Sequence, residues 1–244
     1  MKLSELSNIV DGITVLRDGF FSSFGFCETQ GITDLLVYIN RDSYVDKAKK
    51  ESVSCIMTTQ ALADYYKDLN TGLCIADNPS KLFFQAHNYC AKNHILYHEC
   101  SYRTIIGDDC LISPFAIISE KNVTIGKRCV IEAGAIINEN VTIGDDCVIG
   151  SNTVVGTRGL EFYRDGNESV YMEHVGGVRI GNNVEIFSNT TVAAGLIEPT
   201  QIHDHVKIDN LVHIGHSDII GENTFIVSGT KLCRSVHIGK RVSI

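Results

Sequence analysis

Aliphatic residues recur at every sixth position over two long stretches of the chain. The first stretch runs from Ile125 to Val155, and the second runs from Ile202 to Ile244. An α-helix repeats its apolar face every 3.6 residues or so, which excludes a helix here. One repeat of six cannot bury its apolar side alone and must stack on further copies. The pattern therefore predicts short strands and tight corners, with three repeats, or 18 residues, in each turn of a triangular β-coil.

The repeat begins after a junction near Lys92 and is interrupted in three places. One extra residue separates Ile118 from Ile125, and two insertions follow, near residues 157–178 and near residues 193–201. Loops that leave a rigid repeat are common positions for functional sites, although such loops can also be simple decoration. We therefore expect one repeat domain over residues 93–244, with loop insertions that could carry a site.

Residues 1–92 lack the period of six and alternate apolar strand patterns with helical ones. Asn78 and Pro79 stand where an N-cap and a first-turn proline belong, which predicts a helix from Pro79. The alternation indicates a small α/β domain. Its expected strands cover residues 35–39, 53–59 and 72–78, and its expected helices cover residues 44–51, 61–68 and 79–92.

Composition excludes several classes of function. The chain has 244 residues and a net charge of -8, which does not favour nucleic-acid binding. Its apolar runs are too short for a membrane span, and the start MKLSELSNIVDG lacks the features of a secretory signal. We therefore expect a cytoplasmic protein with at most a peripheral membrane association.

The nine cysteines include no CxxC pair, so neither a disulfide framework nor a zinc site is strongly indicated. Cys110, Cys129 and Cys147 each occupy the fifth position of a repeat, where a small inward side chain is expected. The last two are 18 residues apart, so they should stack about 4.8 Å from each other. We expect reduced thiols in the core of the coil.

His216 is the third residue of the repeat IGHSDI, at a corner that we expect to face solvent, and Arg234 lies one coil further along. A neighbouring cation disfavours protonation of an imidazole and keeps it in the neutral form that a general base needs. Arg234 could alternatively bind a phosphate. Both residues could also be solvated corner side chains without a chemical role.

Asp209 is the carboxylate best placed in the sequence to orient His216. Consecutive repeats occupy different sides of the triangle, so the two corners of one chain are about a strand length apart. The two residues are therefore expected to meet only across a groove between subunits. The HxH pair at His203 and the HxxH pair at His213 raise the possibility of zinc. These pairs lie on different corners, so we predict no metal site within one chain.

The hexapeptide period is accompanied by the stretches GGVRIGNNVEIFSNTTV and VKIDNLVHIGHSDIIGENT, which lie between Gly176 and Thr224. On these motifs the chain resembles UDP-3-O-acylglucosamine N-acyltransferase of lipid A synthesis. The order of an α/β domain before the repeats is similar too. The resemblance implies a mainly β fold, in which a left-handed parallel β-helix follows a small α/β domain of the nucleotide-binding type.

The resemblance also implies roles for residues. It implies that His216 is the general base, that Asp209 and Asn210 belong to the active site, and that His174 contacts substrate. The family's uracil site, which uses an aromatic residue, an asparagine and a tyrosine, would fall on Tyr38, Asn40 and Tyr44. The implied assembly is a homotrimer, with active sites in grooves between subunits. The implied acyl donor is acyl carrier protein or coenzyme A, bound as a substrate, with no permanent cofactor.

Three motifs depart from the family. Its Gly-Phe-Gly is replaced by Gly159, Leu160 and Glu161, and its Asp-Arg-Gly is replaced by Ala193, Ala194 and Gly195. Arg234 stands where a glycine is common in the family. The repeat is still running at Ile244, so we expect either further polypeptide or another element to cover the last coil.

Together these features predict an N-acyltransferase of the hexapeptide-repeat class. The enzyme would move an acyl group from a pantetheine thioester to the amino group of a UDP-linked amino sugar. His216 and Asp209 would be catalytic, Asn210 and Arg234 would contact substrate, and the backbone near Ser228 and Gly229 would stabilise the oxyanion. The alternatives are an acetyl-coenzyme A-dependent acetyltransferase of nucleotide sugars, a non-catalytic module that binds sugar nucleotides or serves assembly, and a zinc hydratase.

Overall fold

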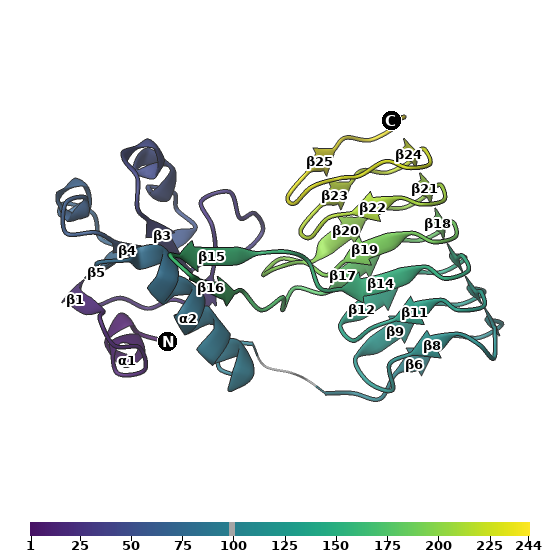
Figure 1. The fold of residues 1–244 in the computed structure, drawn as a ribbon, viewed down its shortest axis with the longest axis horizontal. Coiled ribbons are helices and arrows are strands. Elements are labelled where there is room, and N and C mark those ends of the chain that lie inside the picture. Colours follow the sequence, from purple (N-terminus) through teal and green to yellow (C-terminus); the bar gives the residue numbers. More distant parts are fainter. Residues whose placement is uncertain (98–100) are drawn as a thin grey trace. The chain divides into compact units, whose positions relative to one another are not determined.

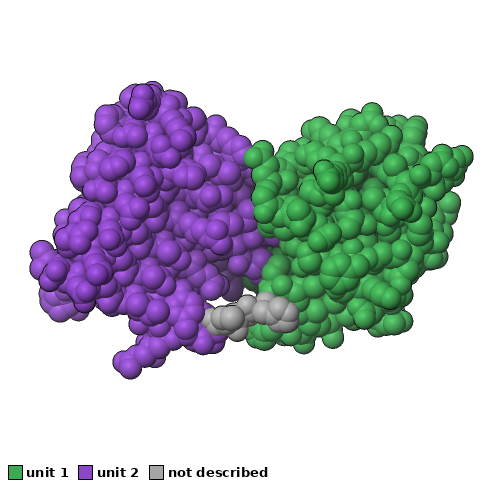
Figure 2. Space-filling view, turned by 180° about the vertical axis from the view of Figure 1, so that it is seen from behind, with its two compact units in different colours: residues 1–99, 160–173 green, residues 100–159, 174–244 purple. Residues whose placement is uncertain are grey.

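The computed structural model describes residues 1–97 and 101–244 and divides into two compact units. Unit 1 comprises Met1–Glu99 and Leu160–Glu173, and unit 2 comprises Cys100–Gly159 and His174–Ile244 (Figure 2). Most of the longer predicted insertion therefore belongs to the first unit.

Unit 1 is built on a five-stranded sheet in the order β1-β5-β4-β3-β2 (Figure 1). Strands β3, β4 and β5 run parallel, and β1 pairs antiparallel with β5. Helix α2 begins as predicted, because the Asn78 side chain accepts a hydrogen bond from Lys81 N at 3.2 Å. The elements are α1 (Leu3–Ser7), β1 (Thr14–Arg17), β2 (Ser23–Phe24), β3 (Leu35–Ile39), β4 (Val53–Thr58), β5 (Gly72–Ile75) and α2 (Pro79–Lys92).

The strand predicted at 35–39 and the helix predicted at 79–92 are confirmed, and the strands predicted at 53–59 and 72–78 are present but end earlier, at Thr58 and Ile75. The helices predicted at 44–51 and 61–68 are wrong, because these segments form only short 3-10 turns. None of these turns has a side-chain N-cap hydrogen bond, and such short pieces cannot offset the free-energy cost of helix nucleation. The turns are η1 (Asp42–Tyr44), η2 (Asp46–Ala48) and η3 (Ala63–Tyr66).

The segment Leu160–Glu173 is a hairpin of β15 (Phe162–Asp165) and β16 (Glu168–Tyr171). Helix α2 holds it through Asn88, whose Nδ2 donates to Tyr171 O at 2.6 Å and whose Oδ1 accepts from Glu173 N at 2.9 Å. His87 Nε2 also lies 2.9 Å from Glu173 O. The hairpin is therefore an integral part of unit 1.

Unit 2 is a left-handed parallel β-helix, as predicted. Its coils follow one another from β6 at one end to β25 at the other (Figure 1). Three parallel sheets form its sides, in the orders β24-β21-β18-β13-β10-β7, β22-β19-β14-β11-β8 and β25-β23-β20-β17-β12-β9-β6.

The strands of unit 2 are short, with two to four residues each. The first coils contain β6 (Ile105–Ile106), β7 (Leu111–Ile112), β8 (Ile117–Ile118), β9 (Val123–Ile125), β10 (Val130–Ile131), β11 (Ile136–Ile137), β12 (Val141–Ile143), β13 (Val148–Ile149) and β14 (Val154–Thr157). The later coils contain β17 (Val178–Ile180), β18 (Glu185–Ile186), β19 (Thr191–Ala193), β20 (Thr200–Ile202), β21 (Lys207–Ile208), β22 (His213–Ile214), β23 (Ile219–Ile220), β24 (Phe225–Ile226) and β25 (His237–Ile238).

The register confirms the coil of 18 residues. Ile131 pairs with Ile149, and Gln201 pairs with Ile219. The aliphatic residue of each repeat points inward, and those from Ile125 to Ile226 are almost completely buried. The stacked aliphatic columns therefore form the core, as expected for a repeat that buries its apolar side on its neighbours.

All three departures from the period of six occur at one edge of the β-helix. The extra residue follows β8, the long insertion follows β14, and the short insertion follows β19. Strands β8, β14 and β19 belong to one sheet, so the segments that follow them all lie at the same edge of the β-helix. We call this edge the insertion edge. Within unit 2 it comprises residues 119–122, 138–140, 158–159, 174–177, 194–199, 215–218 and 233–236.

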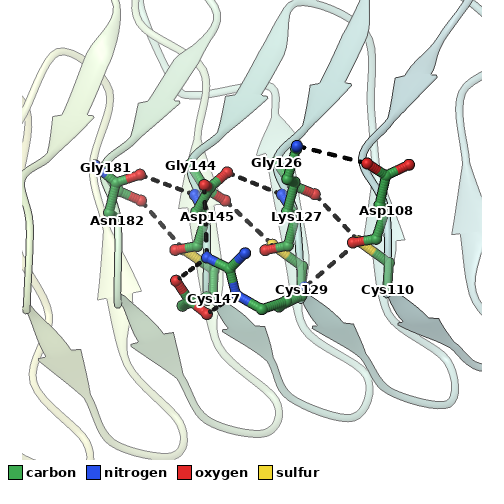
Figure 3. Close-up of polar contacts among 12 residues, drawn as sticks. Asp108, Cys110, Gly126, Lys127, Cys129, Gly144, Asp145, Cys147, Gly181 and Asn182 are labelled. Carbon is green, nitrogen blue, oxygen red and sulfur yellow. Dashed lines mark hydrogen bonds and ion pairs between the residues drawn. The ribbon is translucent and has the colours of Figure 1, made fainter.

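Cys110, Cys129 and Cys147 form a column of free thiols along a different edge (Figure 3). Each Sγ lies 3.1 Å from a glycine carbonyl oxygen of the next coil, at Gly126, Gly144 and Gly181 respectively. The expectation of unbridged inward cysteines is confirmed for these three. Their thiols tie successive coils together.

Helix α2, with 14 residues, is the longest in the described ranges. None of the helices described there has both the length and the apolar character that a membrane crossing requires.

Candidate active site

The two insertions are joined to each other at the insertion edge. Val175 N donates to Leu196 O at 2.9 Å, and Gly195 N donates to Gly177 O at 2.8 Å. This contact leaves no room for side chains, since a Cβ at Gly195 would lie 1.8 Å from Glu198 O. The sequence AAGLIEP therefore forms a fixed structure at this edge.

His216 lies on the turn that follows β22, at the insertion edge. It was expected at a solvent-facing corner, and this expectation is wrong, because only 5% of the residue is exposed. The ring of His174 lies edge-to-face against it, with centroids 5.1 Å apart and planes at 89°. Gly159 covers both rings, since a Cβ there would lie 2.7 Å from both His174 Nε2 and His216 Cδ2.

The turn that carries His216 is held by the coils on both sides. Ser217 N donates to Thr200 Oγ1 at 2.9 Å, and Ser235 N donates to His216 O at 3.0 Å. Ser217 Oγ also accepts from Leu196 N at 3.1 Å, which attaches the short insertion to this turn. Ser217 has a φ of 59°, in the left-handed region, so surrounding contacts must maintain this conformation. The position of His216 is therefore set by three successive coils.

Arg234 is exposed on the next turn of the insertion edge. The pairs His213–Lys231 and Ile219–His237 are each 18 residues apart, so the register of Arg234 over His216 is as predicted.

Asp209 and Asn210 lie on another edge, between the sheets of β21 and β22. Asp209 Oδ1 accepts from Asn210 N and from Asn210 Nδ2, both at 2.7 Å. Ser228 N donates to Asp209 Oδ2 at 3.3 Å, and Gly229 N donates to Asn210 O at 3.3 Å. Ser228 and Gly229 therefore lie over Asp209 and Asn210, and both N–H groups already have acceptors. The structure therefore does not support an oxyanion site made by Ser228 and Gly229 beside His216 of the same chain.

Asp218 is a buried carboxylate that the sequence reasoning missed. It has no exposed surface, and its Oδ2 accepts from Gly215 N at 2.8 Å while its Oδ1 accepts from Val236 N at 2.7 Å. Burial raises its pKa to about 7, and the two backbone N–H donors oppose that rise. A signal was present in the sequence, because an aspartate occupies the inward fifth position of its repeat.

Two of the predicted nucleotide contacts lie at the carboxyl end of β3 in unit 1. The Tyr38 ring packs 5.0 Å from that of Phe83 on α2, and Asn40 Nδ2 donates to Ser80 Oγ at 2.7 Å. Both therefore lie beside the first turns of α2. Tyr44 is on η1, with Lys47 Nζ 4.7 Å from its ring centroid.

Tyr163 of β15 is a further residue of this region that the sequence did not suggest. Its hydroxyl contacts the Asn78 side chain, and its ring lies 6.3 Å from that of Phe84. It comes from a hairpin 85 residues further along the chain than Asn78, so no sequence spacing indicated the contact.

The histidine pairs that suggested zinc do not gather at one point. In residues 1–97 and 101–244, no group of three or more histidine, cysteine, aspartate or glutamate side chains is arranged to hold a metal ion.

Comparison with known proteins supports the hexapeptide interpretation. Residues 122–157 match the family described as bacterial transferase hexapeptide (six repeats), and residues 103–139 match the hexapeptide repeat of succinyl-transferase. A UDP-3-O-acylglucosamine N-acyltransferase of Dechloromonas aromatica is 43% identical over 82 residues, which cover 34% of this chain and 24% of that protein. Another, from Legionella pneumophila, is 35% identical over 123 residues, which cover 50% of this chain and 31% of that protein.

The resemblance to this class of N-acyltransferase is thus confirmed over the matched region. That region spans about a quarter to a third of the length of these relatives. Among solved structures, a UDP-N-acetylglucosamine acyltransferase from Campylobacter jejuni is similar with 23% identity and a TM-score of 0.36. The match covers 57% of this chain and 62% of that one.

Proposed function

We propose that this chain belongs to an enzyme that transfers an acyl group from a pantetheine thioester to the amino group of a UDP-linked amino sugar. The observation that carries the proposal is the enclosure of His216 by His174, Gly159 and the two joined insertions. The curated relatives with this repeat are N-acyltransferases of acylglucosamine, which supports the reaction class. The donor is acyl carrier protein or coenzyme A, bound as substrate.

In the proposed reaction, His216 is the general base. The sugar amine attacks the thioester carbonyl and gives a proton to the imidazole, the C–N bond forms, and the C–S bond breaks. The imidazolium then returns the proton to the departing thiolate, so the thiol leaves neutral. Arg234, one coil further along, is proposed to contact the substrate. His174, against the same ring, is proposed to contact the substrate.

In unit 1 the proposed ligand is the uridine of the sugar nucleotide. Tyr38 is a half-buried aromatic ring packed against Phe83, and the Asn40 side chain is held by Ser80 at 2.7 Å with its carboxamide oxygen left as an acceptor. Tyr44 is 38% exposed and offers a second aromatic surface. These contacts support a site for a base that both stacks and forms hydrogen bonds.

The proposed assembly is a homotrimer in which Asp209 of one subunit meets His216 of the next. Phe187, Asp209 and Val227 follow β18, β21 and β24, which are neighbours in one sheet, so they form a column. Phe187 is 40% exposed, Leu211 is 61% exposed and Val227 is 56% exposed. Rows of exposed large apolar side chains are typical of an interface, which supports a partner at the Asp209 edge.

The proposal is tested with purified protein, a set of UDP-amino sugars, and thioesters of short and long chains on coenzyme A and on carrier protein. We expect thiol release that depends on the sugar, and a loss of about 100-fold or more in kcat for His216→Ala. His203→Ala, an exposed histidine on a different edge, is the matched control and should retain activity. Binding of a UDP-sugar without thiol release from any donor would instead support a non-catalytic module.

A further inference from the structure

Asp218 is a buried carboxylate for which the proposed reaction has no use. It lies two residues after His216, at the inward position that closes each turn of the β-helix. Elsewhere this position holds small apolar, thiol or hydroxyl side chains, such as Val206, Cys147 and Thr224. A carboxylate in such a buried place costs free energy of folding unless its hydrogen bonds are made. The hydrogen bonds of Asp218 should therefore show what the buried carboxylate does.

Threonines at the equivalent position provide the comparison. Thr190 Oγ1 accepts from Val212 N and Thr224 Oγ1 accepts from Val242 N, both at 3.2 Å. The same hydroxyls donate to carbonyl oxygens at the start of the next coil's turn, at Asp209 and Gly239. All of these hydrogen bonds lead to the following coil and none returns to the residue's own turn. Thr190 and Thr224 therefore only join one coil to the next, whereas Thr200, at the same position on the insertion edge, also donates to Ala193 O in its own turn at 2.7 Å.

Asp218 makes the same contact with the next coil and adds a second contact of a different kind. Its Oδ1 accepts from Val236 N at 2.7 Å, and its Oδ2 accepts from Gly215 N at 2.8 Å, in its own turn. Gly215 immediately precedes His216. A carboxylate accepts backbone hydrogen bonds more strongly than a hydroxyl does, because the acceptor is charged. One side chain thus fixes the peptide N–H beside His216 relative to the coil that carries Arg234.

The turn before His216 is packed tightly against the next coil, as are the turns at Gly126, Gly144 and Gly221. A Cβ at Gly215 would lie 2.5 Å from Cys233 O, so the backbone before His216 lies directly against the next coil. Ser217 has a φ of 59°, a left-handed conformation that the corresponding corner residues Asn223 and Ser235 share. Thr200 provides the contact from the preceding coil, and Asp218 provides the contact toward the following coil.

We propose that Asp218 is a positioning residue for His216, acting through its hydrogen bond to Gly215 N. The catalytic consequence of this inference rests on the proposed function. The pair of hydrogen bonds from Gly215 N and Val236 N to Asp218, which we call the clamp, does not depend on it. The two carboxylate oxygens of Asp218 each accept from one N–H group, whereas the single hydroxyl of threonine replaces both oxygens and, at Thr200, donates to its own turn instead of accepting from it.

The test is Asp218→Thr, which introduces the residue found naturally at positions 153, 190 and 224 and should therefore fold. Hydrogen exchange resolved to single residues should show faster exchange at Gly215, with Val236 still protected. We expect kcat to fall about ten-fold with KM within about two-fold, because the base is displaced and binding is not. Thr224→Val, at the equivalent position on another edge, is the matched control. It should expose Val242 N to exchange without changing kcat.

Unchanged exchange at Gly215 in Asp218→Thr would overturn the clamp. Faster exchange with an unchanged kcat would overturn the positioning role. An equal fall in kcat for Thr224→Val would show a general effect of weakened coils and would also overturn it. Absence of turnover in the unmodified protein with every donor would reject the proposed function and, with it, the catalytic role of Asp218. The exchange measurement would still decide whether the clamp exists.

Discussion

Replacing Gly159 by alanine tests whether the enclosure of His216 matters for turnover. The added Cβ would lie 2.7 Å from His174 Nε2 and from His216 Cδ2, and 3.1 Å from His216 Cβ. An ordinary contact between such atoms is about 3.5 Å, so the rings must move apart by roughly 0.8 Å. The backbone at Gly159 is not in the left-handed region, so the effect of the methyl group is purely steric.

A displacement of about 1 Å in a catalytic group can reduce a rate about 100-fold. We therefore expect kcat of Gly159→Ala to fall by about 10- to 100-fold, and overpacking to lower the free energy of unfolding by about 1–3 kcal/mol. The rate of thiol release measures kcat, and urea unfolding measures the free energy of unfolding. Gly239→Ala is the matched control, because its Cβ would meet only Val242 Cγ2, at 3.9 Å. A normal kcat in Gly159→Ala would refute the assignment of His216 as the base at this edge.

Two further predictions concern pH and assembly. The pKa of Asp218 is about 7 in the folded chain, above its ordinary value of 3.8. As pH rises, the unfolded chain loses this proton before the folded chain does, so the free energy of unfolding falls between about pH 4 and about pH 7. Urea unfolding should give a lower free energy of unfolding at pH 8 than at pH 5, and this difference should be smaller in Asp218→Thr. An equal difference in the variant would assign the loss of stability to other groups. Phe187→Glu should convert the proposed trimer to folded monomers in light scattering and abolish turnover, because Asp209 and His216 of neighbouring subunits would no longer meet. Ile105 is 56% exposed on the opposite sheet, and Ile105→Glu, the control, should leave the proposed trimer intact. A trimer that persists in Phe187→Glu would place the interface on another surface.

The repeat made most of unit 2 predictable. A period of six specifies which side chains point inward, and counting by 18 gives the neighbours in the next coil, such as Arg234 over His216. It also correctly separated Asp209 from His216 within one chain. In unit 1, the capped helix at Pro79 was predictable because Asn78 and the proline specify its start locally.

The burial of His216 was not predictable in this way. The period describes the backbone of the coil, whereas Gly159 and His174, which cover His216, come from an insertion that follows no period. The hairpin Leu160–Glu173 was missed as a part of unit 1 because its contacts with Asn88 of α2 span 83 or more residues of sequence. Asp218, by contrast, was detectable, since a carboxylate at an inward position conflicts with the local pattern and so requires a specific reason.

Because every change in repeat length is confined to the insertion edge, the other two edges keep a uniform spacing along the whole β-helix. Loops at the insertion edge can therefore lengthen, shorten or change sequence without moving any core residue or any residue of the Asp209 edge. Selection can act on the enclosure of His216 separately from the stability of the coil and from the surface offered to a partner. A six-residue deletion elsewhere would have the opposite effect, since it would rotate every later residue onto a different edge. Such a scaffold allows the loops around His216 to change while the coil stays the same.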